Sequence, residues 1–380
     1  MTKNNKKYKH LLSFSFILFI LIMFVINIFK GEKEFSEEEN RNLSKKPELT
    51  FNSFINGDYT EKFESYISDQ LPGRRLFVNA KFKIDMLLGK SEVNDVFIGK
   101  ENQLMEDFHQ SSNEQTDDKV LAINEFKKLH ENANVSFMLI PTSAEILKEK
   151  LPRNAPVDSE LEFMNYVQGN LNSNIKFISP YNALYENRDQ YLYYRTDHHW
   201  TTKGAYIAYV EFCKTAGIEP KNEEEFNIQL VANDFYGSLT SKIGQRSGEG
   251  DNINVYIPKE NSEVVVNYVS EQRRSSSLYN SASLDEKDKY QVFTSGNHPH
   301  INIKSLGDPK KKLLLIKDSY ANSFLPFLTA HYGEIDVIDL RYYMDDVNKL
   351  MEEKGITDVL FLYNVNTFNS DNSILNIIPN

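Results

Sequence analysis

The chain has 380 residues, 12% of them aromatic, which is enough to bury one large core and a smaller satellite. Its formal net charge is −11, and five of its lysines lie within the first thirty residues, so the remainder carries 38 basic against 54 acidic residues. Such an acidic body is a poor match for duplex nucleic acid, which rewards clustered positive charge, but it tolerates a neutral sugar polymer. The single cysteine, Cys213, excludes an intrachain disulfide and a cysteine-rich zinc site.

The N-terminal segment is typical of a membrane anchor. Residues 1–10 are rich in lysine, and residues 11–29 are apolar apart from two serines and one asparagine. A run of this length, at about 1.5 Å per residue, nearly matches a hydrocarbon core of about 30 Å. The positive-inside bias then predicts a single-pass cell-membrane protein with residues 1–10 in the cytoplasm and everything after Lys30 outside. A cleavable signal peptide is the alternative, although the apolar run is long and no small-x-small site precedes Lys30.

Beyond the anchor, the pattern predicts a charged, solvated stalk at residues 30–50 and one domain over residues 51–380. Apolar spacing in residues 51–88 predicts two amphipathic helices broken at Pro72-Gly73. Residues 222–309 contain alternating segments and predict a β-rich insertion that forms a wall over a cleft. The rest alternates short buried strands with helices, as in an α/β layer. The predicted strands are 135–140, 175–178, 313–316, 335–338 and 359–363, and the helices include 117–131, 144–150 and 345–353.

The most informative motif is the run Tyr-Tyr-Arg-Thr-Asp-His-His-Trp-Thr-Thr-Lys-Gly at residues 193–204. A serine nucleophile needs a base to take its proton and an acid to hold that base in one tautomer, and Asp197 and His199 are candidates for these groups. Their spacing of two places both side chains on the same side of an extended segment, so His198 points elsewhere. Taken alone, the run is equally typical of a polar loop that carries two histidines.

The candidate nucleophile is Ser319, where the predicted strand 313–316 gives way to a helix. At such a turn a nucleophile is exposed at the carboxyl edge of a sheet, and backbone N–H groups at the helix start can stabilise an oxyanion. Pro326 is tolerated only near the first turn of that helix, so we expect the helix to begin late or to kink. A serine in this position is also typical of a helix cap without chemistry.

Together, Arg195-Thr196-Asp197-His198-His199-Trp200-Thr201 with Lys203-Gly204 and the later Asp318-Ser319-Tyr320 resemble the DHHW proteins and the alginate O-acetyltransferase-like branch of the SGNH hydrolase superfamily. A weaker match covers Glu38 to Leu43 before Pro47, and Asp69 to Arg74. The resemblance implies a three-layer α/β/α, flavodoxin-like domain with a circularly permuted motif order. In it Ser319 is the nucleophile, His199 the base and Asp197 the orienting acid. One departure is Lys317, where relatives often have glycine.

The same resemblance implies a function. It predicts an extracytoplasmic O-acetyltransferase that acylates hydroxyls of a cell-surface polysaccharide or exopolysaccharide, such as cellulose, an alginate-like polymer or a cell-wall glycan. The acetyl group is expected from a polytopic membrane-bound O-acyltransferase, and no soluble cofactor is expected. Two alternatives stay open: a carbohydrate acetyl esterase with the same triad, and a non-catalytic protein that binds glycan or scaffolds an exopolysaccharide assembly.

Four further residues have predicted roles around this site. Gly237, in a segment that resembles the family, is a candidate second oxyanion donor or a turn glycine. Trp200 either packs beneath the motif loop or stacks on a sugar, and Tyr320 either lines the acyl pocket or belongs to the core. Arg195 flanks the Asp197 and His199 pair.

Metal catalysis is a second enzymatic class that the sequence allows. His198, His199, His298 and His300 with Asp197 offer the nitrogen and oxygen ligands typical of zinc. Residues 297–300, however, lie in a polar turn of the predicted insertion, and nothing in the sequence forces them near His199. No metal is therefore expected.

Overall fold

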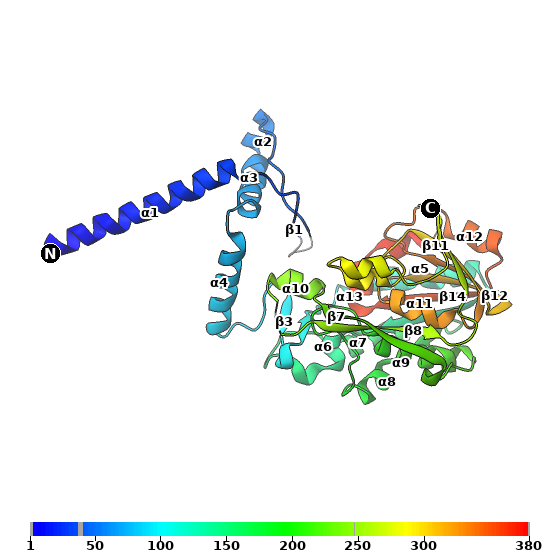
Figure 1. Ribbon diagram of the computed structural model, residues 1–380. Helices are drawn as coiled ribbons and strands as arrows, with labels where there is room; N and C mark the ends of the chain where they lie inside the picture. Colours follow the sequence, from blue (N-terminus) through cyan, green and yellow to red (C-terminus); the bar gives the residue numbers. More distant parts are fainter. Residues whose placement is uncertain (1–2, 37–40, 247, 379–380) are drawn as a thin grey trace. The chain divides into compact units, whose positions relative to one another are not determined.

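The computed structural model describes residues 3–36, 41–246 and 248–378 (Figure 1). Contacts along the backbone divide the chain into two compact units. The first comprises Met1–Lys90 with Ser241–Arg246, and the second comprises Ser91–Thr240 with Ser247–Asn380. The sequence analysis assigns residues 51–90 to the main domain, whereas these residues group with the first unit here.

The first unit begins with the long helix α1 (Lys3–Phe29). Its segment Lys7–Asn27 has a mean hydropathy of 2.3 and is unburied, so this helix is long and apolar enough to cross a membrane, a test that a signal sequence also passes. Three helices follow a short pairing of β1 (Phe35–Ser36) with β2 (Arg41–Asn42): α2 (Phe51–Ile55), α3 (Asp58–Asp69) and α4 (Arg74–Leu87). The break before α4 falls at Gly73, whose φ of +69° suits glycine.

In this unit, Asp69 and Gln70 of the weaker family match bond to Ser44 and Lys33, which lie on either side of the stretch 38–43. The Asp69 carboxylate accepts the Ser44 N–H at 2.9 Å. The Gln70 side chain donates to the Lys33 carbonyl at 2.8 Å. Glu38, Glu39 and Asn40 of that match lie outside the described residues.

The second unit is built on an eight-stranded sheet of order β10-β9-β11-β13-β12-β14-β5-β6. The strands from β13 to β6 in this order run parallel, and the other three pair antiparallel at one edge. β12 thus lies in the interior of the sheet, with a parallel neighbour on each side. The strands are β5 (Asn134–Ile140), β6 (Lys176–Ile178), β9 (Val264–Tyr268), β10 (Arg273–Ser275), β11 (His300–Ser305), β12 (Asp308–Lys317), β13 (Tyr332–Ile338) and β14 (Asp358–Asn364).

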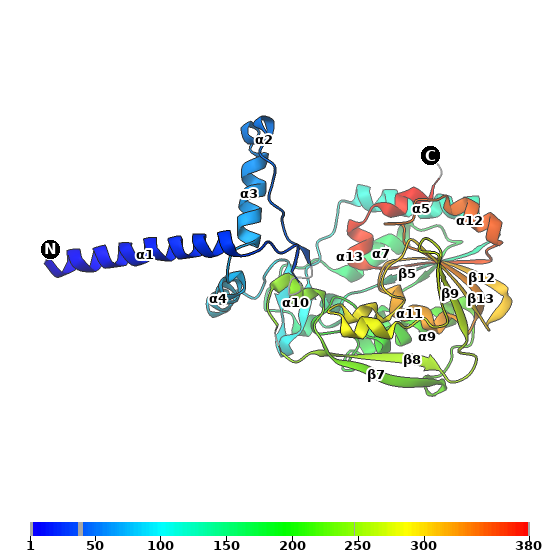
Figure 2. The same cartoon turned by 45° about the horizontal axis from the view of Figure 1, so that its top comes forward.

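Helices cover both faces of this sheet (Figure 2). Successive side chains of a strand point to opposite faces, so Leu313 and Leu315 of β12 enter one core cluster while Leu314 and Ile316 enter the other. The first cluster packs against α8 (Tyr181–Glu186), α9 (Thr202–Ala216) and α11 (Ala321–Leu328). The second packs against α5 (Asn113–Leu129), α7 (Glu160–Asn170), α12 (Val347–Lys354) and α13 (Val365–Ser370). The predicted three-layer α/β/α architecture is confirmed.

Residues 222–309 are divided between two structures. β7 (Phe226–Phe235) and β8 (Asp251–Pro258) form a two-stranded sheet of their own, joined through α10 (Ser238–Ile243). β9, β10 and β11 instead extend the central sheet. Between β10 and β11 lie two short 3-10 helices, η4 (Ser281–Asp285) and η5 (Lys289–Val292). The segment predicted as one insertion therefore also completes the main sheet.

Two further features of this unit are short. β3 (Val96–Ile98) and β4 (Leu104–Glu106) form a hairpin, and α6 (Ser143–Ile146) follows β5. Cys213 is buried on α9, among the core residues that the sequence pattern predicts.

Candidate active site

Ser319 lies in the turn that connects β12 to α11. The preceding residue, Asp318, is buried and fixes this turn. Its carboxylate accepts the Tyr320 N–H at 2.9 Å, and the backbone and side-chain N–H groups of Asn364 at 2.7 and 2.6 Å. Because Asn364 ends the neighbouring parallel strand β14, the Ser319 turn is attached to the carboxyl edge of the sheet.

The structure brings the three predicted triad residues together. His199 Nε2 lies 2.7 Å from Ser319 Oγ, and His199 Nδ1 lies 2.5 Å from Asp197 Oδ1. Asp197 Oδ1 also accepts the backbone N–H of His199 at 3.0 Å. A continuous chain of hydrogen bonds therefore runs from a buried carboxylate through an imidazole to a partly exposed serine hydroxyl, an arrangement suited to nucleophilic catalysis.

Electrostatics set the charge states of Asp197 and His199. Burial works against the Asp197 carboxylate, but His199, His198 and the Ser238 N–H hold its pKa below the usual range. Burial, together with the adjacent His198, lowers the pKa of His199 to about 4 despite the carboxylate. At neutral pH the pair is thus an aspartate hydrogen-bonded to a neutral imidazole, so Nε2 is free to accept a proton.

His198 faces away from the serine. Its Nδ1 lies 2.6 Å from Ser238 Oγ, and its side chain is 28% exposed. As the spacing predicts, the two adjacent histidines point in different directions: His199 bonds to Ser319, and His198 bonds to Ser238.

Asp251, which the sequence analysis does not single out, holds the motif loop in place. It is fully buried, and its carboxylate accepts hydrogen bonds from the Thr196 N–H (2.8 Å), the Thr196 hydroxyl (2.6 Å), the Arg195 N–H (3.0 Å) and the Tyr191 hydroxyl (2.5 Å). The Arg195 side chain points the same way, with Nε 3.4 Å from Asp251. No spacing rule connects residues 251 and 196, so the sequence alone gives no signal for this contact.

Gly237 lies against Asp197, on the far side from the serine hydroxyl in the hydrogen-bond chain. A Cβ atom at Gly237 would fall 2.2 Å from Asp197 Oδ2, so the residue must lack a side chain. Its N–H donates to Thr196 Oγ1 at 3.1 Å, and the next N–H, of Ser238, donates to Asp197 Oδ2 at 2.7 Å. This acceptor differs from the oxyanion, which is one of the two roles predicted for Gly237, because close backbone packing directs the N–H to Thr196.

Trp200 and Tyr320 are both buried and connect the motif loop to the serine turn. The Trp200 indole N–H lies 3.0 Å from both the Tyr320 carbonyl and Ser323 Oγ. The Tyr320 hydroxyl donates to the His198 carbonyl. Of the two roles weighed for Trp200, this position gives packing beneath the loop, because a fully buried ring offers no face to a sugar. Tyr320 likewise belongs to the core.

A second residue that the sequence analysis does not single out is Tyr290 of η5. Its ring stacks on the His199 imidazole, with centroids 3.8 Å apart and planes 10° apart. It enters the site from the segment between β10 and β11, for which the sequence predicts only a wall over the cleft.

The possible metal ligands do not converge on one open position. Asp197, His198 and His199 place potential ligand atoms within 4.8 Å of one another. However, both nitrogens of His199 and Nδ1 of His198 already have hydrogen-bond partners. His298 is bound to Glu271, and His300 to Asp336.

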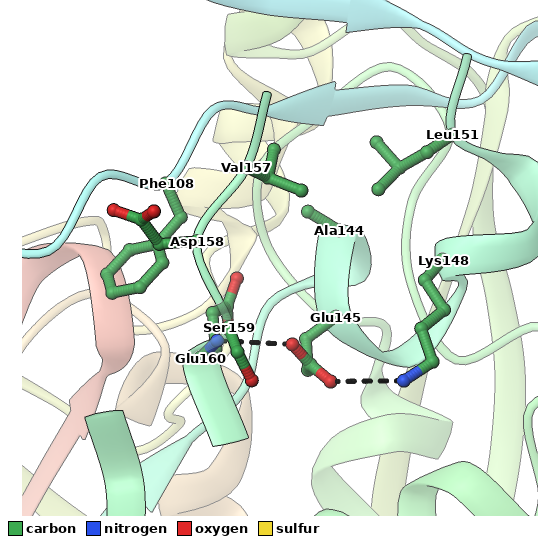
Figure 3. Close-up of a pocket in the computed structure, with 9 residues that line it drawn as sticks. All are labelled: Phe108, Ala144, Glu145, Lys148, Leu151, Val157, Asp158, Ser159 and Glu160. Carbon is green, nitrogen blue, oxygen red and sulfur yellow. Dashed lines mark hydrogen bonds and ion pairs between the residues drawn. The ribbon is translucent and has the colours of Figure 1, made fainter. Parts of the chain in front are cut away.

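A separate pocket of about 210 Å³ lies beside α6 and the start of α7, and no triad residue lines it (Figure 3). Glu145 lies between Lys148 and the Glu160 N–H, with contacts of 3.5 and 3.1 Å. Glu160 is buried and accepts from the Thr142 N–H at 2.7 Å and hydroxyl at 2.5 Å. Burial nevertheless raises the pKa of Glu160 to about 8, so this side chain is neutral near pH 7.

The comparisons with known proteins agree with the fold and motifs. The family model for DHHW protein matches residues 91–338. No curated protein matches the chain. The structure of a DHHW family protein from Eubacterium siraeum aligns with a TM-score of 0.66 and 23% identity, covering 76% of this chain and 97% of that chain. PatB1 from Bacillus cereus, solved with a sulfonyl adduct, aligns with a TM-score of 0.64 and 21% identity, covering 76% and 100%. At these identities the two likenesses show a shared fold. Since the family model covers well over half of the sequence, the chain belongs to the DHHW family.

Proposed function

We propose that this protein is an extracytoplasmic O-acetyltransferase that acylates hydroxyls of a polysaccharide through an acetyl-enzyme on Ser319. The observation that carries the proposal is the hydrogen-bond chain from Asp197 through His199 to Ser319, with its 2.5 and 2.7 Å contacts. A hydroxyl at a strand-to-helix turn with a neutral imidazole against it is equipped to attack an acyl carbonyl.

In the first half-reaction, Ser319 Oγ attacks the acetyl carbonyl of the donor while His199 Nε2 takes its proton. Asp197 stabilises the imidazolium that forms, and His199 then protonates the departing group of the donor. In the second half-reaction, a sugar hydroxyl gives its proton to His199 and attacks the acetyl-serine. The ester bond to Ser319 breaks, and its oxygen recovers the proton.

The backbone supplies a donor for the negative charge on the carbonyl oxygen. Across residues 3–36, 41–246 and 248–378, no hydrogen-bond acceptor is found for the Ser319 N–H. It lies at the start of α11, where the helix dipole favours negative charge. We therefore assign the Ser319 N–H to the oxyanion, and Gly237 to the support of Asp197.

The proposal extends to location and partners. We infer that α1 anchors the chain in the cell membrane, with residues 1–10 in the cytoplasm and the sheet domain outside. A polytopic membrane-bound O-acyltransferase would then deliver the acetyl group, and no soluble coenzyme would take part. The relative PatB1 has been solved with a sulfonyl adduct, which supports a reactive nucleophile within this fold.

The test is a competition between sugar and water for the acetyl group. The full chain, purified in detergent, is incubated with a small acetyl ester and candidate oligosaccharides, and mass spectrometry measures acetylated sugar against free acetate. Water is present at about 55 M, but a hydroxyl held in attacking geometry can reach effective molarities of about 10⁵ M. A transferase therefore yields acetylated sugar, and Ser319→Ala yields neither product.

The other outcomes identify the alternatives. Free acetate alone, with every oligosaccharide tested, would replace the transferase by a carbohydrate acetyl esterase. If neither product forms while an oligosaccharide still binds, the protein is a non-catalytic glycan-binding or scaffold protein.

A further inference from the structure

Tyr290 contacts both the base and the residue that carries the nucleophile. Its side chain is buried, and its ring lies parallel to the His199 imidazole at a centroid distance of 3.8 Å. Its hydroxyl donates to the Ser319 carbonyl at 3.0 Å and lies 3.2 Å from Ser323 Oγ. One side chain from a distant segment of the chain thus spans the two halves of the site.

We infer that Tyr290 is a positioning residue for the relay, which fixes the plane of the His199 ring and the turn of Ser319. The inference rests on the proposed function, since it assigns a role within that reaction. Tyr290 needs no contact with the substrate to act in this way.

The geometry explains why the ring needs such a support. The hydrogen bonds of His199 to Asp197 and Ser319 leave from opposite nitrogens, so they tolerate rotation of the imidazole about the axis that joins them. The His198 ring also lies 3.8 Å from His199, but it is tilted by 37°. Tyr290, at 10°, is the nearly parallel surface that defines the plane. A π face also attracts the positive charge that His199 acquires in each half-reaction.

The ring of Tyr290 and the residues that follow it are anchored by further contacts. Phe293 and Tyr194 pack against the Tyr290 ring, with centroids 5.1 and 6.2 Å away. Farther along, the buried Lys317 Nζ bonds to Asn297 Oδ1 at 2.7 Å and to Asn322 Oδ1 at 2.9 Å. Lys317 thereby ties this segment to β12 and α11. This gives a structural reason for a lysine at the position where the resemblance leads us to expect glycine.

Several charged groups face the pair and contribute to its titration. Asp197 and Glu106 favour the protonated form of His199, whereas burial and His198 oppose it. Asp288 is close enough to Asp197 and His198 for their charges to influence its pKa. Burial, with Asp197 and Asp318 nearby, raises the pKa of Tyr290 well above its usual value, so its hydroxyl remains a donor at all working pH values.

The test compares Tyr290→Phe and Tyr290→Ala in the full chain in detergent. Tyr290→Phe keeps the stacked ring and loses one hydroxyl, so we expect kcat for 4-nitrophenyl acetate to fall about 3- to 10-fold with an unchanged acid limb of kcat/KM. Tyr290→Ala admits water to the face of His199. We therefore expect kcat to fall on the order of 100-fold, and the acid limb to move up by about one pH unit as the imidazole regains hydration.

Val255→Ala is the matched control, because Val255 is buried in the same small cluster but belongs to β8, outside the segment that carries Tyr290. It should lower the melting temperature while leaving kcat and the acid limb near those of the wild type. If Tyr290→Ala lowers the melting temperature like Val255→Ala but leaves the acid limb in place, Tyr290 is a core residue and the inference is wrong.

A second readout separates this inference from the proposed function. Phenylmethanesulfonyl fluoride forms a bond between Ser319 Oγ and sulfur, fluoride leaves, and the proton passes to His199, so labelling requires the relay but no acetyl donor. If the wild type is labelled without turning over acetyl esters, the transferase proposal fails, and the labelling rates of the Tyr290 variants decide their role. If the wild type is not labelled at all, both proposals are overturned.

Discussion

The indole N–H of Trp200 donates a hydrogen bond that connects the histidine motif to the turn of Ser319. This N–H lies 3.0 Å from the backbone carbonyl of Tyr320, although the two residues are 120 positions apart in the chain. Trp200 directly follows His199, and Tyr320 directly follows Ser319. The contact therefore helps to fix the distance between the candidate base and the candidate nucleophile through the residues that follow them.

Replacing Trp200 by Phe should impair catalysis more than stability. A phenyl ring fills most of the space of the indole, but the bonds to the Tyr320 carbonyl and Ser323 Oγ are lost, so we expect a loss of about 1–2 kcal/mol in the free energy of unfolding. Ester turnover should fall at least about 10-fold, because His199 and Ser319 lose their fixed separation.

Tyr209→Phe is the control for Trp200→Phe. Tyr209 is also buried, and its hydroxyl contacts His331 Nε2 at 2.6 Å and the Lys221 N–H at 2.8 Å. It should cost similar stability, measured by denaturant unfolding, without lowering kcat. Equal losses of kcat in both variants would contradict the role given to Trp200.

The adjacent histidines should respond very differently to substitution. His199→Ala removes the partner of both Asp197 and Ser319, so ester turnover should drop by a factor of about 10³ or more. His198→Ala removes a side chain bonded to Ser238 and should retain most of the activity. Initial rates of ester turnover are measured for both variants and for the wild type, with and without a chelator. Equal losses in the two variants, or a loss of wild-type activity when the chelator is added, would favour a shared metal site.

Asp251→Asn should destabilise the motif loop, although residue 251 lies far from that loop in the sequence. The carboxylate accepts five hydrogen bonds, and the NH₂ group of an amide would face some of these donors, so we expect a loss of about 2–4 kcal/mol in the free energy of unfolding. Ester turnover should fall as well, since the loop carries Asp197.

Asp336→Asn offers a comparison for Asp251→Asn, because Asp336 is also fully buried but bonds to His300 and Asn302. It should lower stability and spare kcat. If Asp251→Asn keeps wild-type kcat, the loop does not depend on this carboxylate.

Glu160 should make the stability of the protein depend on pH. Its pKa is about 8 in the folded chain against 4.5 as the reference value, so the unfolded chain releases this proton at lower pH. The contribution is fully present below about pH 4.5 and is lost as pH rises through about 8. Between pH 5 and 8 we expect the free energy of unfolding to fall by about 3 kcal/mol from this group.

Glu160→Gln should flatten that dependence, because an amide can keep both contacts with Thr142 without ionising. Thermal unfolding of the full chain in detergent at several pH values measures the effect. Glu162→Gln, on the exposed side of the same helix, should retain the wild-type slope. A Glu160→Gln variant with an unchanged slope would show that Glu160 is ionised in the folded chain.

Local pattern made a large part of the structure predictable. The buried run 313–316 lies in β12, and the alternation of strands and helices gave the three layers, because side-chain period and turn residues act over short distances. The spacing of Asp197 and His199 likewise reflects a local geometry, which the 2.5 Å contact bears out.

The supports of the site were not predictable in this way. Asp251 and Tyr290 reach the motif through tertiary packing, and neither lies at a spacing that relates it to His199. Gly237 shows the same limit: its segment could be recognised, but the close approach to Asp197 that determines which acceptor its N–H takes follows from packing alone.

The central claim is that Ser319 carries the acetyl group between donor and acceptor, and trapping that intermediate tests it most directly. The full chain is mixed with an acetyl ester, quenched in acid within one turnover, digested and analysed by peptide mass spectrometry. The account predicts an acetyl group on the peptide that contains Ser319, its disappearance when an accepted oligosaccharide is added before the quench, and its absence in His199→Ala. Turnover of the ester with Ser319 unmodified at every time point, or an acetyl group that accumulates on another residue, would contradict it.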